Sequence, residues 1–565
     1  MPEWIVKDRK FDDLVDQLLY NRGVIEVEAD DEENPSEVEA KRIFFEPDFS
    51  KNMHDPFLLK NLAKAVDRIK LAFDNKEKIG IFADYDADGV PGAALFYRAL
   101  KKIGIESEVY IPSRVEGYGL SKIGLDFLKS KKCELIITID LGIRSFAEAE
   151  YAKKIGLDLI ITDHHLPDEK NPDAYLVINP KQRGDKYPNK DLCGCAVAFK
   201  LIQGLAKAFP KELDEKFLKW NLDLVAISTI SDVVPLSNEN RIIAQFGLIV
   251  MRKSHNLGLA ELIKVSNLDA KNIGAYHVGF QIGPRINAPG RMGKATKSFE
   301  LLITEDPKEA EELAQWLNSE NESRQTAMDK TEKEADKYIA ENKLAENKVI
   351  VLRGQWQKGV IGPTASRLVE KYSRPVILFA EEGTTLVGSA RSVSGVHIIN
   401  LLTEAKELIA KFGGHAGAAG LSIKSLNWQK FQTKIAKVAE EKIKDSDLVK
   451  KIKIDAGVSL SELSQKLYEK LLRFEPFGMG NPRPVFMAEK VGFENIRFVG
   501  RDQNHFQARA VDEIERIKLI HFSFPYDKSM IKSDQPYDIA FTLNLDEWNG
   551  NSELCLHIID IRMND

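Results

Sequence analysis

Short, continuous apolar runs recur between residues 78 and 180, and stretches with helical patterning separate them. The runs lie in the segments KIGIFAD, ESEVYIP, CELIITID, LDLIITD and AYLVINP. A strand that is apolar throughout is usually buried on both faces, as in a parallel sheet that helices cover on each side. The pattern therefore predicts an α/β domain with a parallel sheet, followed by two helices near 194–208 and 214–230.

The second half of the chain has a different organisation. Residues 305–345 are highly charged and lack glycine, and their single proline, Pro307, suits the first turn of a helix. We predict one long helix that leads to a second α/β unit, in which NKVIVLRG, PVILFA and LVGSARSV are strand candidates. From 485 to 563, β-type runs rich in phenylalanine predict a small all-β domain.

These patterns predict five parts. They are an N-terminal segment (1–45), an α/β domain (46–304), a linker helix (305–345), a second α/β domain (346–448) and a C-terminal β domain (449–565). Residues 24–40 carry eight acidic residues and no lysine or arginine, so we expect a solvated segment there.

Composition narrows the class of protein. With 43% hydrophobic and 29% charged residues the chain resembles ordinary soluble globular proteins, and no apolar run reaches the roughly 18 residues of a membrane span. Four cysteines are too few for a disulfide scaffold, and no apolar signal core opens the sequence, so we expect a cytoplasmic protein. The net charge of −6 argues mildly against a nucleic-acid binder, but carboxylates that hold metal ions are included in that sum.

Acidic residues and histidines follow three of the predicted strands. In an open α/β sheet, ligands bind in the crevice beyond the carboxyl ends of the strands, so these side chains should meet at one edge. Their mutual repulsion would raise several pKa values unless a cation were present, and hard divalent metals accept carboxylate oxygens and imidazole. The residues are Asp84, Asp86 and Asp88, then Asp140, then Asp163, His164 and His165.

Each of these residues also has an ordinary explanation. A single aspartate after a strand is usually a helix cap or a turn former, and the Asp-His-His sequence could belong to a polar loop. Asp232, in TISDVVPL, follows an apolar helix and would be unremarkable by itself. Caps, turns or polar loops do not explain why polar clusters follow three strands of the same predicted sheet, so we favour a metal site.

The motifs resemble those of the DHH phosphoesterases. DYDADG, the strand ending in Asp140, DHH and SDVVPL match the four family motifs in order, and GGHAGAAG (413–420) is similar to the glycine-rich motif of the companion domain. EPFGMGNPRPVF (475–486) resembles the hallmark of the RecJ branch, the single-strand-specific 5′→3′ DNA exonucleases. The matches run from about residue 80 to residue 490.

The resemblance implies a catalytic site with two divalent metal ions, usually manganese or magnesium. Asp140 would bridge them, His165 would contact the substrate phosphate, and Asp163 would orient the histidines. The implied metal ligands are Asp86, Asp88, Asp140, His164 and Asp232, with Asp84 in addition.

The resemblance also implies residues that bind DNA. Ser389 and Arg391, two apart on a predicted strand, would hold the 5′ phosphate, and Arg114 has a similar implied role. Arg285 and Arg291 lie in GPRINAPGR, which we expect to be a Gly/Pro-rich loop that contacts phosphates. In GGHAGAAG we expect Gly414, His415 and Gly417 to cradle a phosphate, although tight packing could account for Gly417 and Gly420. Gln357 stands where the family commonly has histidine.

The C-terminal domain is similar to an OB fold, whose aromatic residues can stack bases, although most of these phenylalanines should be core. The resemblance implies single-stranded DNA as the substrate, single-strand-binding protein and a RecQ-type helicase as partners, and a monomer that acts in DNA repair and recombination. Two alternatives stay open: a DHH phosphatase or oligonucleotide hydrolase acting on small substrates, and a non-catalytic DNA-binding scaffold.

Overall fold

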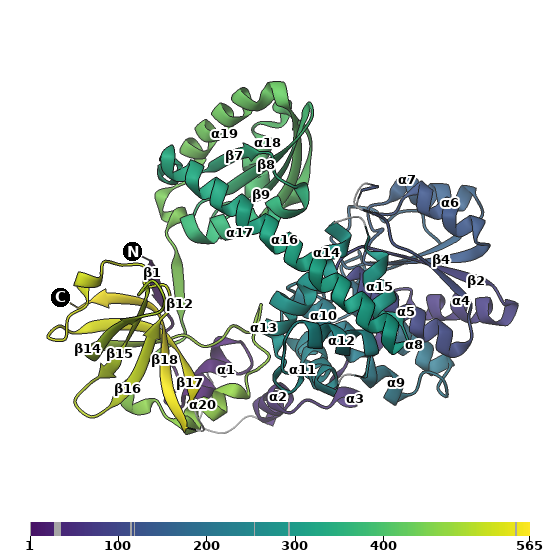
Figure 1. The fold of residues 1–565 in the computed structure, drawn as a ribbon. Coiled ribbons are helices and arrows are strands. Elements are labelled where there is room, and N and C mark those ends of the chain that lie inside the picture. Colours follow the sequence, from purple (N-terminus) through teal and green to yellow (C-terminus); the bar gives the residue numbers. More distant parts are fainter. Residues whose placement is uncertain are drawn as a thin grey trace. The chain divides into compact units, whose positions relative to one another are not determined.

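A computed structural model describes residues 2–26, 35–113, 116–117, 119–253, 255–291, 294–548 and 551–564 (Figure 1). The chain divides into two compact units: Met1–Ile5 with Ser319–Ile452, and Val6–Asn318 with Lys453–Asp565. The long helix α16 (Pro307–Glu341) contains the boundary between them and begins at the proline that the sequence marked. Among the described helices, none has the length and apolar character that a membrane crossing requires.

A five-stranded parallel sheet forms the centre of the first α/β domain, as the apolar runs predict. The strand order is β3-β2-β4-β5-β6, and every neighbouring pair is parallel. The strands are β2 (Lys78–Ala83), β3 (Ser107–Tyr110), β4 (Cys133–Ile139), β5 (Asp158–Thr162) and β6 (Leu176–Ile178).

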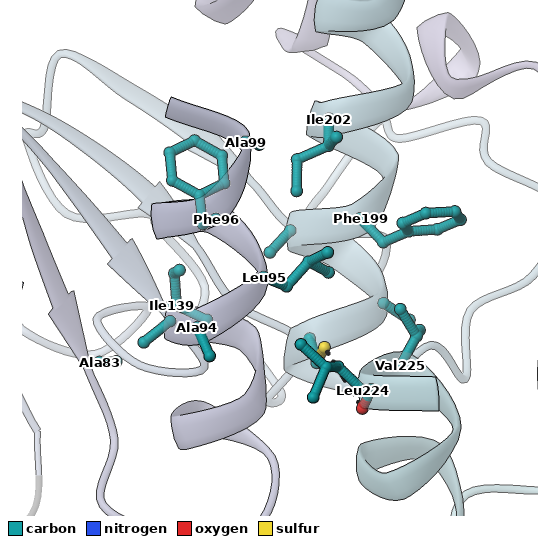
Figure 2. Packing of buried hydrophobic residues seen from close by; sticks show 14 of the residues in the cluster. Ala83, Ala94, Leu95, Phe96, Ala99, Ile139, Phe199, Ile202, Leu224 and Val225 are labelled. Carbon is teal, nitrogen blue, oxygen red and sulfur yellow. Dashed lines mark hydrogen bonds between the residues drawn. The ribbon is translucent and has the colours of Figure 1, made fainter. Parts of the chain in front are cut away.

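Helices cover both faces of this sheet. One face packs against α4 (Leu62–Asn75), α5 (Gly89–Ile103) and α8 (Gly194–Ala208), and Figure 2 shows side chains of α5 and α8 in contact there. The other face packs against α6 (Lys122–Ser130) and α7 (Phe146–Lys154). Each fully buried leucine, isoleucine or phenylalanine of these two cores contributes roughly 1.5–3 kcal/mol, so the sheet is a rigid base for the residues at its edge.

A group of helices completes this domain. They are α3 (Phe49–Asn52), α9 (Glu215–Trp220), α10 (Leu222–Ser231), α11 (Asn238–Lys253), α12 (Leu257–Val265), α13 (Ala275–His277), α14 (Gly283–Arg291) and α15 (Thr296–Ile303). The single helix predicted over 214–230 is wrong, because Asn221 ends α9 and precedes α10. Its backbone is not helical, and its side-chain amide donates to the carbonyl of Phe217.

The segment GPRINAPGR is a helix, α14, and the predicted loop is wrong. A π-helical turn, Val278–Ile282, precedes it. The glycines serve close packing: a Cβ on Gly283 would lie 2.4 Å from Ser231 Oγ, and one on Gly290 would lie 2.5 Å from the carbonyl oxygen of Tyr85. The sequence pattern of glycine and proline is the same for a loop and for a helix in tight contact, so it did not distinguish them.

The unit that contains Ser319–Ile452 has a mixed sheet with the order β10-β11-β9-β8-β7, in which only β7 and β8 are parallel. Its strands are β7 (Ile350–Gly354), β8 (Val376–Glu382), β9 (Thr385–Arg391), β10 (Ile409–His415) and β11 (Ala418–Lys424). Its helices are α17 (Lys358–Tyr372), α18 (Ile398–Thr403) and α19 (Trp428–Lys442).

The C-terminal domain is a closed five-stranded barrel, which confirms the OB-like fold. The pairing β14-β15-β16-β18-β17 returns from β17 to β14. Its strands are β14 (Phe486–Val499), β15 (His505–Val511), β16 (Arg516–His521), β17 (Tyr537–Trp548) and β18 (Asn551–Met563), with α20 (Gln465–Leu472) before them. Phe486, Phe493, Phe506 and Phe541 are buried in it, whereas Phe522 is 53% exposed.

The N-terminal segment contributes to the barrel core. Leu14, Leu18 and Leu19 of α1 (Leu14–Asn21) are buried in the same hydrophobic cluster as the barrel phenylalanines. Residues 27–34 of the acidic stretch lie outside the described residues. Residues 35–40 form the first part of a helix, α2 (Pro35–Phe45), and none of them is buried, so this part of the stretch is solvated, as predicted.

Candidate active site

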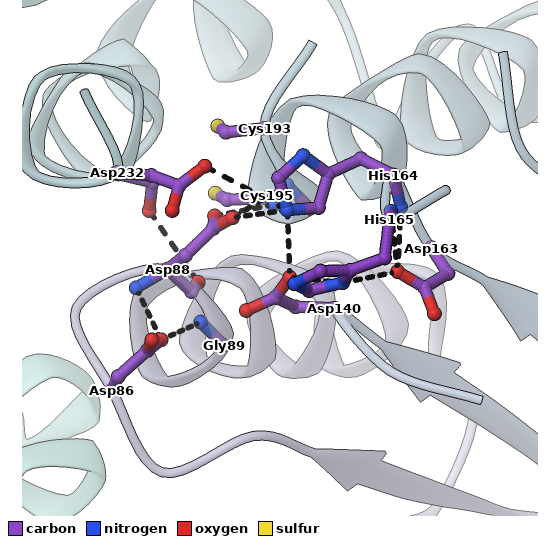
Figure 3. A network of polar contacts seen from close by, with 12 residues as sticks. Asp86, Asp88, Gly89, Asp140, Asp163, His164, His165, Cys193, Cys195 and Asp232 are labelled. Atoms are coloured by element: carbon purple, nitrogen blue, oxygen red, sulfur yellow. Dashed lines mark hydrogen bonds and ion pairs between the residues drawn. The ribbon is translucent and has the colours of Figure 1, made fainter. Parts of the chain in front are cut away.

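Four chain segments bring acidic residues and histidines to the carboxyl edge of the parallel sheet (Figure 3). The segments follow β2, β4, β5 and α10. The Nε2 atom of His164 lies 3.2 Å from Asp140 Oδ1, 3.6 Å from Asp232 Oδ2 and 3.8 Å from Asp88 Oδ2. The clusters that lie far apart in the sequence are therefore neighbours, as the strand-end rule predicts.

Backbone N–H groups hold the DYDADG turn in place. Asp86 Oδ1 accepts from the backbone N–H groups of Asp88 (2.9 Å) and Gly89 (3.1 Å), at the start of α5. The Asp88 carboxylate accepts from the N–H groups of Gly194 (2.6 Å) and Cys195 (2.8 Å), at the start of α8. The N-terminus of a helix favours a negative charge, so α8 stabilises Asp88 as an anion.

Asp140 has an unusual backbone. Its φ of 64° lies in the left-handed region, which costs a non-glycine residue roughly 1–3 kcal/mol and persists mainly at functional sites. Residue 194 packs closely against the Asp140 side chain. A Cβ on Gly194 would lie 2.6 Å from Asp140 Oδ1, so only glycine fits beside this carboxylate.

Asp163 links the two histidines. Its Oδ1 accepts from the backbone N–H groups of His164 (2.7 Å) and His165 (3.0 Å), and Nδ1 of His165 lies 2.8 Å from the same oxygen. Burial raises the pKa of Asp163, but the hydrogen bonds and the charge of His165, with the backbone N–H of Ile143, together outweigh burial and leave this pKa below its ordinary value. Burial lowers the pKa of His165, but its contact with Asp163 and the charges of the neighbouring aspartates leave that pKa raised.

The remaining carboxylates repel one another. Burial, and then the charge of Asp86, raises the pKa of Asp88 to about 6 and that of Asp84 well above its ordinary value. Burial, and then the charge of Asp88, raises the pKa of Asp232 to about 8 and that of Asp140 well above its ordinary value. A bound cation would reverse these shifts, because it favours the charged form of each carboxylate.

The donor atoms fit divalent metal ions. Asp84 Oδ1, Asp140 Oδ1 and His164 Nε2 are buried and make no hydrogen bond within the described part of the chain. Burial, and then the neighbouring His165, lowers the pKa of His164 to about 3, so its imidazole is neutral and available as a ligand. Three groups of atoms converge closely enough to hold an ion: Asp84–Asp86–Asp140, Asp88–His164–Asp232 and Asp140–His164–His165.

Sequence reasoning missed the support from α14. Asn287 Oδ1 accepts from the backbone N–H of Ala87, between Asp86 and Asp88, at 2.7 Å. The two segments are separated by 200 residues, so local sequence patterns do not reveal this contact. Asn287 lies within GPRINAPGR, and the Gly/Pro-rich pattern of this motif predicts a phosphate-binding loop instead.

In the other compact unit, the predicted phosphate-binding residues occupy one end of the mixed sheet. His415 on β10 pairs with Ala418 on β11, which pairs with Arg391 on β9, so these three side chains share one face. Ser389 lies on the same face of β9, as predicted, and its Oγ accepts from Arg391 Nη1 at 3.0 Å. Burial lowers the pKa of Arg391, and this guanidinium forms no ion pair with any carboxylate of the described residues.

The glycines of GGHAGAAG differ in their surroundings. Gly414 has a φ of 149°, and a Cβ there would lie 2.2 Å from the carbonyl oxygen of Ala418, so the hairpin requires glycine. A Cβ on Gly420 would meet nothing within 4 Å, and one on Gly417 would only touch the His415 ring at 3.9 Å. Tight packing therefore does not account for Gly417 and Gly420, and the open backbone leaves room for a ligand.

The three other arginines give less information. Nε of Arg285 donates to Asn318 Oδ1 (2.9 Å), and its Nη1 donates to the carbonyl of Gln281 (2.8 Å). Arg291 ends α14, but its side chain is not described. Arg114 lies outside the described residues. The roles of all three in DNA binding stay predictions.

Family models match three parts of the chain. The N-terminal domain of the DHH family matches residues 78–229, the DHHA1 domain matches residues 346–445, and the RecJ OB domain matches residues 454–560. These matches coincide with the parallel-sheet domain, the mixed-sheet unit and the barrel described above.

Whole proteins match as well. The single-stranded-DNA-specific exonuclease RecJ of Bacillus subtilis is 35% identical over 98% of this chain and 68% of its own length. The Escherichia coli enzyme of the same name is 33% identical over 89% of this chain and 90% of its own length. The crystal structure of Thermus thermophilus RecJ in complex with Mn²⁺ has a TM-score of 0.81 at 26% identity, covering 100% of this chain and 80% of that one. The chain therefore belongs to the RecJ family of single-stranded-DNA-specific exonucleases, within the DHH phosphoesterases.

Proposed function

We propose that the protein is a single-strand-specific DNA exonuclease that degrades DNA from 5′ to 3′, releases 5′ mononucleotides by hydrolysis, and acts in DNA repair and recombination. One observation carries the proposal. Buried carboxylates with raised pKa values and a neutral histidine converge at the sheet edge, with ligand atoms that make no hydrogen bond to the described residues, in a chain of the RecJ family.

The proposed metal ligands are Asp86, Asp88, Asp140, His164 and Asp232, with Asp84, and they would hold two Mn²⁺ or Mg²⁺ ions. When bound, such a pair of ions lowers the pKa of water and neutralises negative charge on the phosphodiester. The protein supplies the geometry: α8 fixes Asp88, the turn at Asp86 fixes the start of α5, and Gly194 fixes Asp140.

His165 is the proposed contact to the substrate phosphate. Its Nδ1 faces the Asp163 carboxylate at 2.8 Å, which raises the pKa of His165 and favours a cationic ring. A cationic donor beside a phosphate oxygen forms a charge-assisted hydrogen bond, so His165 would both bind the substrate and stabilise negative charge during hydrolysis.

The proposed 5′-phosphate pocket contains Ser389, Arg391 and His415, with Gly414 and Gly417 beside them. Metal ions alone do not distinguish a 5′ end from a 3′ end, so the direction of digestion requires a separate group that binds the terminal phosphate. Arg391 suits this role, because it is a partly buried guanidinium without a carboxylate partner in the described structure.

The barrel is the proposed site for more distant nucleotides. Phe522 is the exposed phenylalanine of this domain among those described, and the rings of His505 and His557 lie beside it. We further propose a monomer that acts in the cytoplasm and works with single-strand-binding protein and a RecQ-type helicase. The four buried cysteines are free, as expected in a reducing compartment.

Digestion of labelled DNA tests the proposal. Single-stranded and blunt double-stranded DNA, each labelled at the 5′ or the 3′ end, should be incubated with the full-length protein and Mn²⁺. We expect a 5′ label on single strands to appear at once as mononucleotide, while duplex DNA persists. Hydrolysis of dinucleotides or small phosphate esters without digestion of long strands would favour the small-substrate phosphatase, and binding without hydrolysis would favour the scaffold.

A further inference from the structure

Two large aromatic side chains stack on the surface near the candidate active site. Tyr276 and Phe280 lie four residues apart, on α13 and the π-helical turn, so they share one helical face. Their ring centroids are 4.9 Å apart with an interplanar angle of 27°, and they are 65% and 68% exposed. The fold leaves this aromatic surface uncovered within the described structure.

The pair lies in a groove that begins beside a proposed metal ligand. A cavity of about 1050 Å³ is lined by Tyr276 and Phe280, and also by Ser231 and Val233, which flank Asp232 in the sequence. Met479, from the segment EPFGMGNPRPVF, also lines this cavity. The backbone N–H of Leu236 donates to the carbonyl of Met479 at 2.7 Å, so this part of the lining is fixed to the segment that follows Asp232.

The charged residues of the groove favour an anionic occupant. Of the described residues in its lining, Arg252, Arg473 and Arg483 are cationic and Glu475 is acidic. Arg473 and Arg483 form ion pairs with Glu46 (3.1 Å) and Glu475 (3.8 Å), whereas Arg252 donates to the carbonyl of Ile273 and forms no ion pair with a carboxylate of the described residues. Exposed aromatic faces next to arginines are typical of surfaces that bind single-stranded nucleic acid, since bases stack on the rings and the arginines contact phosphates. Val233 and Met479, which are 57% and 56% exposed, add apolar contacts for bases.

We propose that Tyr276 and Phe280 form a stacking platform for bases of the single strand, at nucleotides that follow the terminal one held at the metal ions. This inference rests on the proposed exonuclease function and adds the path of the strand away from the site. The occupant is single-stranded DNA, because the groove is continuous with the segment that carries Asp232 and its lining combines two exposed, stacked aromatic rings with three arginines.

The test combines two changes: removal of a single base from the DNA strand, and removal of the two aromatic rings from the protein. Binding of 5′-phosphorylated single strands should be measured by fluorescence anisotropy, with full-length protein carrying Asp140→Ala so that the DNA is not digested. A single abasic site is moved along the strand from the 5′ end. We expect one short run of positions at which the missing base weakens binding by about 5- to 150-fold, the range measured for base–aromatic stacking.

The double variant Tyr276→Ala/Phe280→Ala should bind the intact strand more weakly, and its affinity should no longer depend on the position of the abasic site. Phe280→Trp keeps an aromatic face and should retain this dependence on position. Tyr338→Ala is the matched control, since Tyr338 is 52% exposed on α16 and does not line the groove, and it should behave like the parent protein.

Two results would overturn the inference. One is tight binding of single strands whose affinity does not depend on the position of the abasic site. That result would indicate that the groove binds an apolar protein segment. The other is a penalty that persists unchanged in the double variant. Failure of the parent protein to bind any single strand would instead reject the proposed function, so the two failures are distinguishable.

Discussion

Replacement of Asp232 by asparagine should stabilise the metal-free protein, although it removes a proposed metal ligand. Burial and the charges of Asp88 and Asp86 raise the pKa of Asp232 to about 8, so its ionised form is unfavourable in the folded state. The Asp232 carboxylate accepts no hydrogen bond from the described residues, and its Oδ2 lies 3.6 Å from His164 Nε2. Asparagine is similar in shape and removes the charge without removing such a bond.

The magnitude follows from the pKa. A rise from 3.8 to about 8 corresponds to roughly 5–6 kcal/mol when the group is fully ionised. The side chain is 30% exposed, and water screens part of the repulsion, so we expect about half of this value, roughly 2–3 kcal/mol. For a domain of this size, 1 kcal/mol shifts Tm by about 2–4 °C, so the variant should melt roughly 5–10 °C higher.

The dependence on pH has a definite sign. A carboxyl group whose pKa is raised by folding binds its proton more tightly in the folded state than in the unfolded state. Its destabilising effect is therefore absent below about pH 4 and grows until the pH passes about 8. The difference in Tm between the variant and the parent protein should be largest at pH 8 and clearly smaller at pH 6.

The assay is thermal unfolding of both proteins in EDTA at pH 6 and pH 8, followed by the same measurement with Mn²⁺. Mn²⁺ should raise the Tm of the parent protein and raise that of Asp232→Asn less, and the variant should lose hydrolysis. Asp74→Asn, the same change on the exposed face of α4, is the control and should leave Tm unchanged. A variant that melts at the same or a lower temperature than the parent in EDTA at pH 8 would refute the reasoning.

Three further predictions concern individual residues. Asp140→Ala should abolish hydrolysis while the Kd for single-stranded DNA stays nearly unchanged, and near-normal turnover in Mn²⁺ would contradict the bridging role. Arg391→Ala should lower kcat/KM on 5′-phosphorylated single strands by about 10- to 150-fold, because it removes a charged hydrogen bond of roughly 1.5–3 kcal/mol; equal losses on 5′-hydroxyl strands would show that Arg391 does not read the terminal phosphate. Asn287→Ala removes the acceptor for the Ala87 N–H and should weaken Mn²⁺ affinity, measured by titration calorimetry, by about 10- to 100-fold. Asn287→Asp keeps that acceptor and should retain most of the affinity.

The sequence alone determined the fold class and the members of the acidic cluster. The apolar runs identified buried parallel strands, and the rule that ligands bind at strand ends grouped Asp84, Asp140 and Asp163 although up to 79 residues separate them. Charge and the lack of glycine identified the helix that became α16. These features are visible because strand burial and helix periodicity are local properties of the chain.

Only the tertiary structure decided how the cluster is supported. It showed that GPRINAPGR is a helix whose Asn287 holds the DYDADG turn, that Gly194 packs against Asp140, and that EPFGMGNPRPVF is fixed to the segment after Asp232. It also separated Gly414, which the hairpin requires, from Gly420, which has open space beside it. Contacts between segments far apart in the chain depend on the packing of whole elements, and a glycine or an asparagine in the sequence does not specify which segment will lie against it.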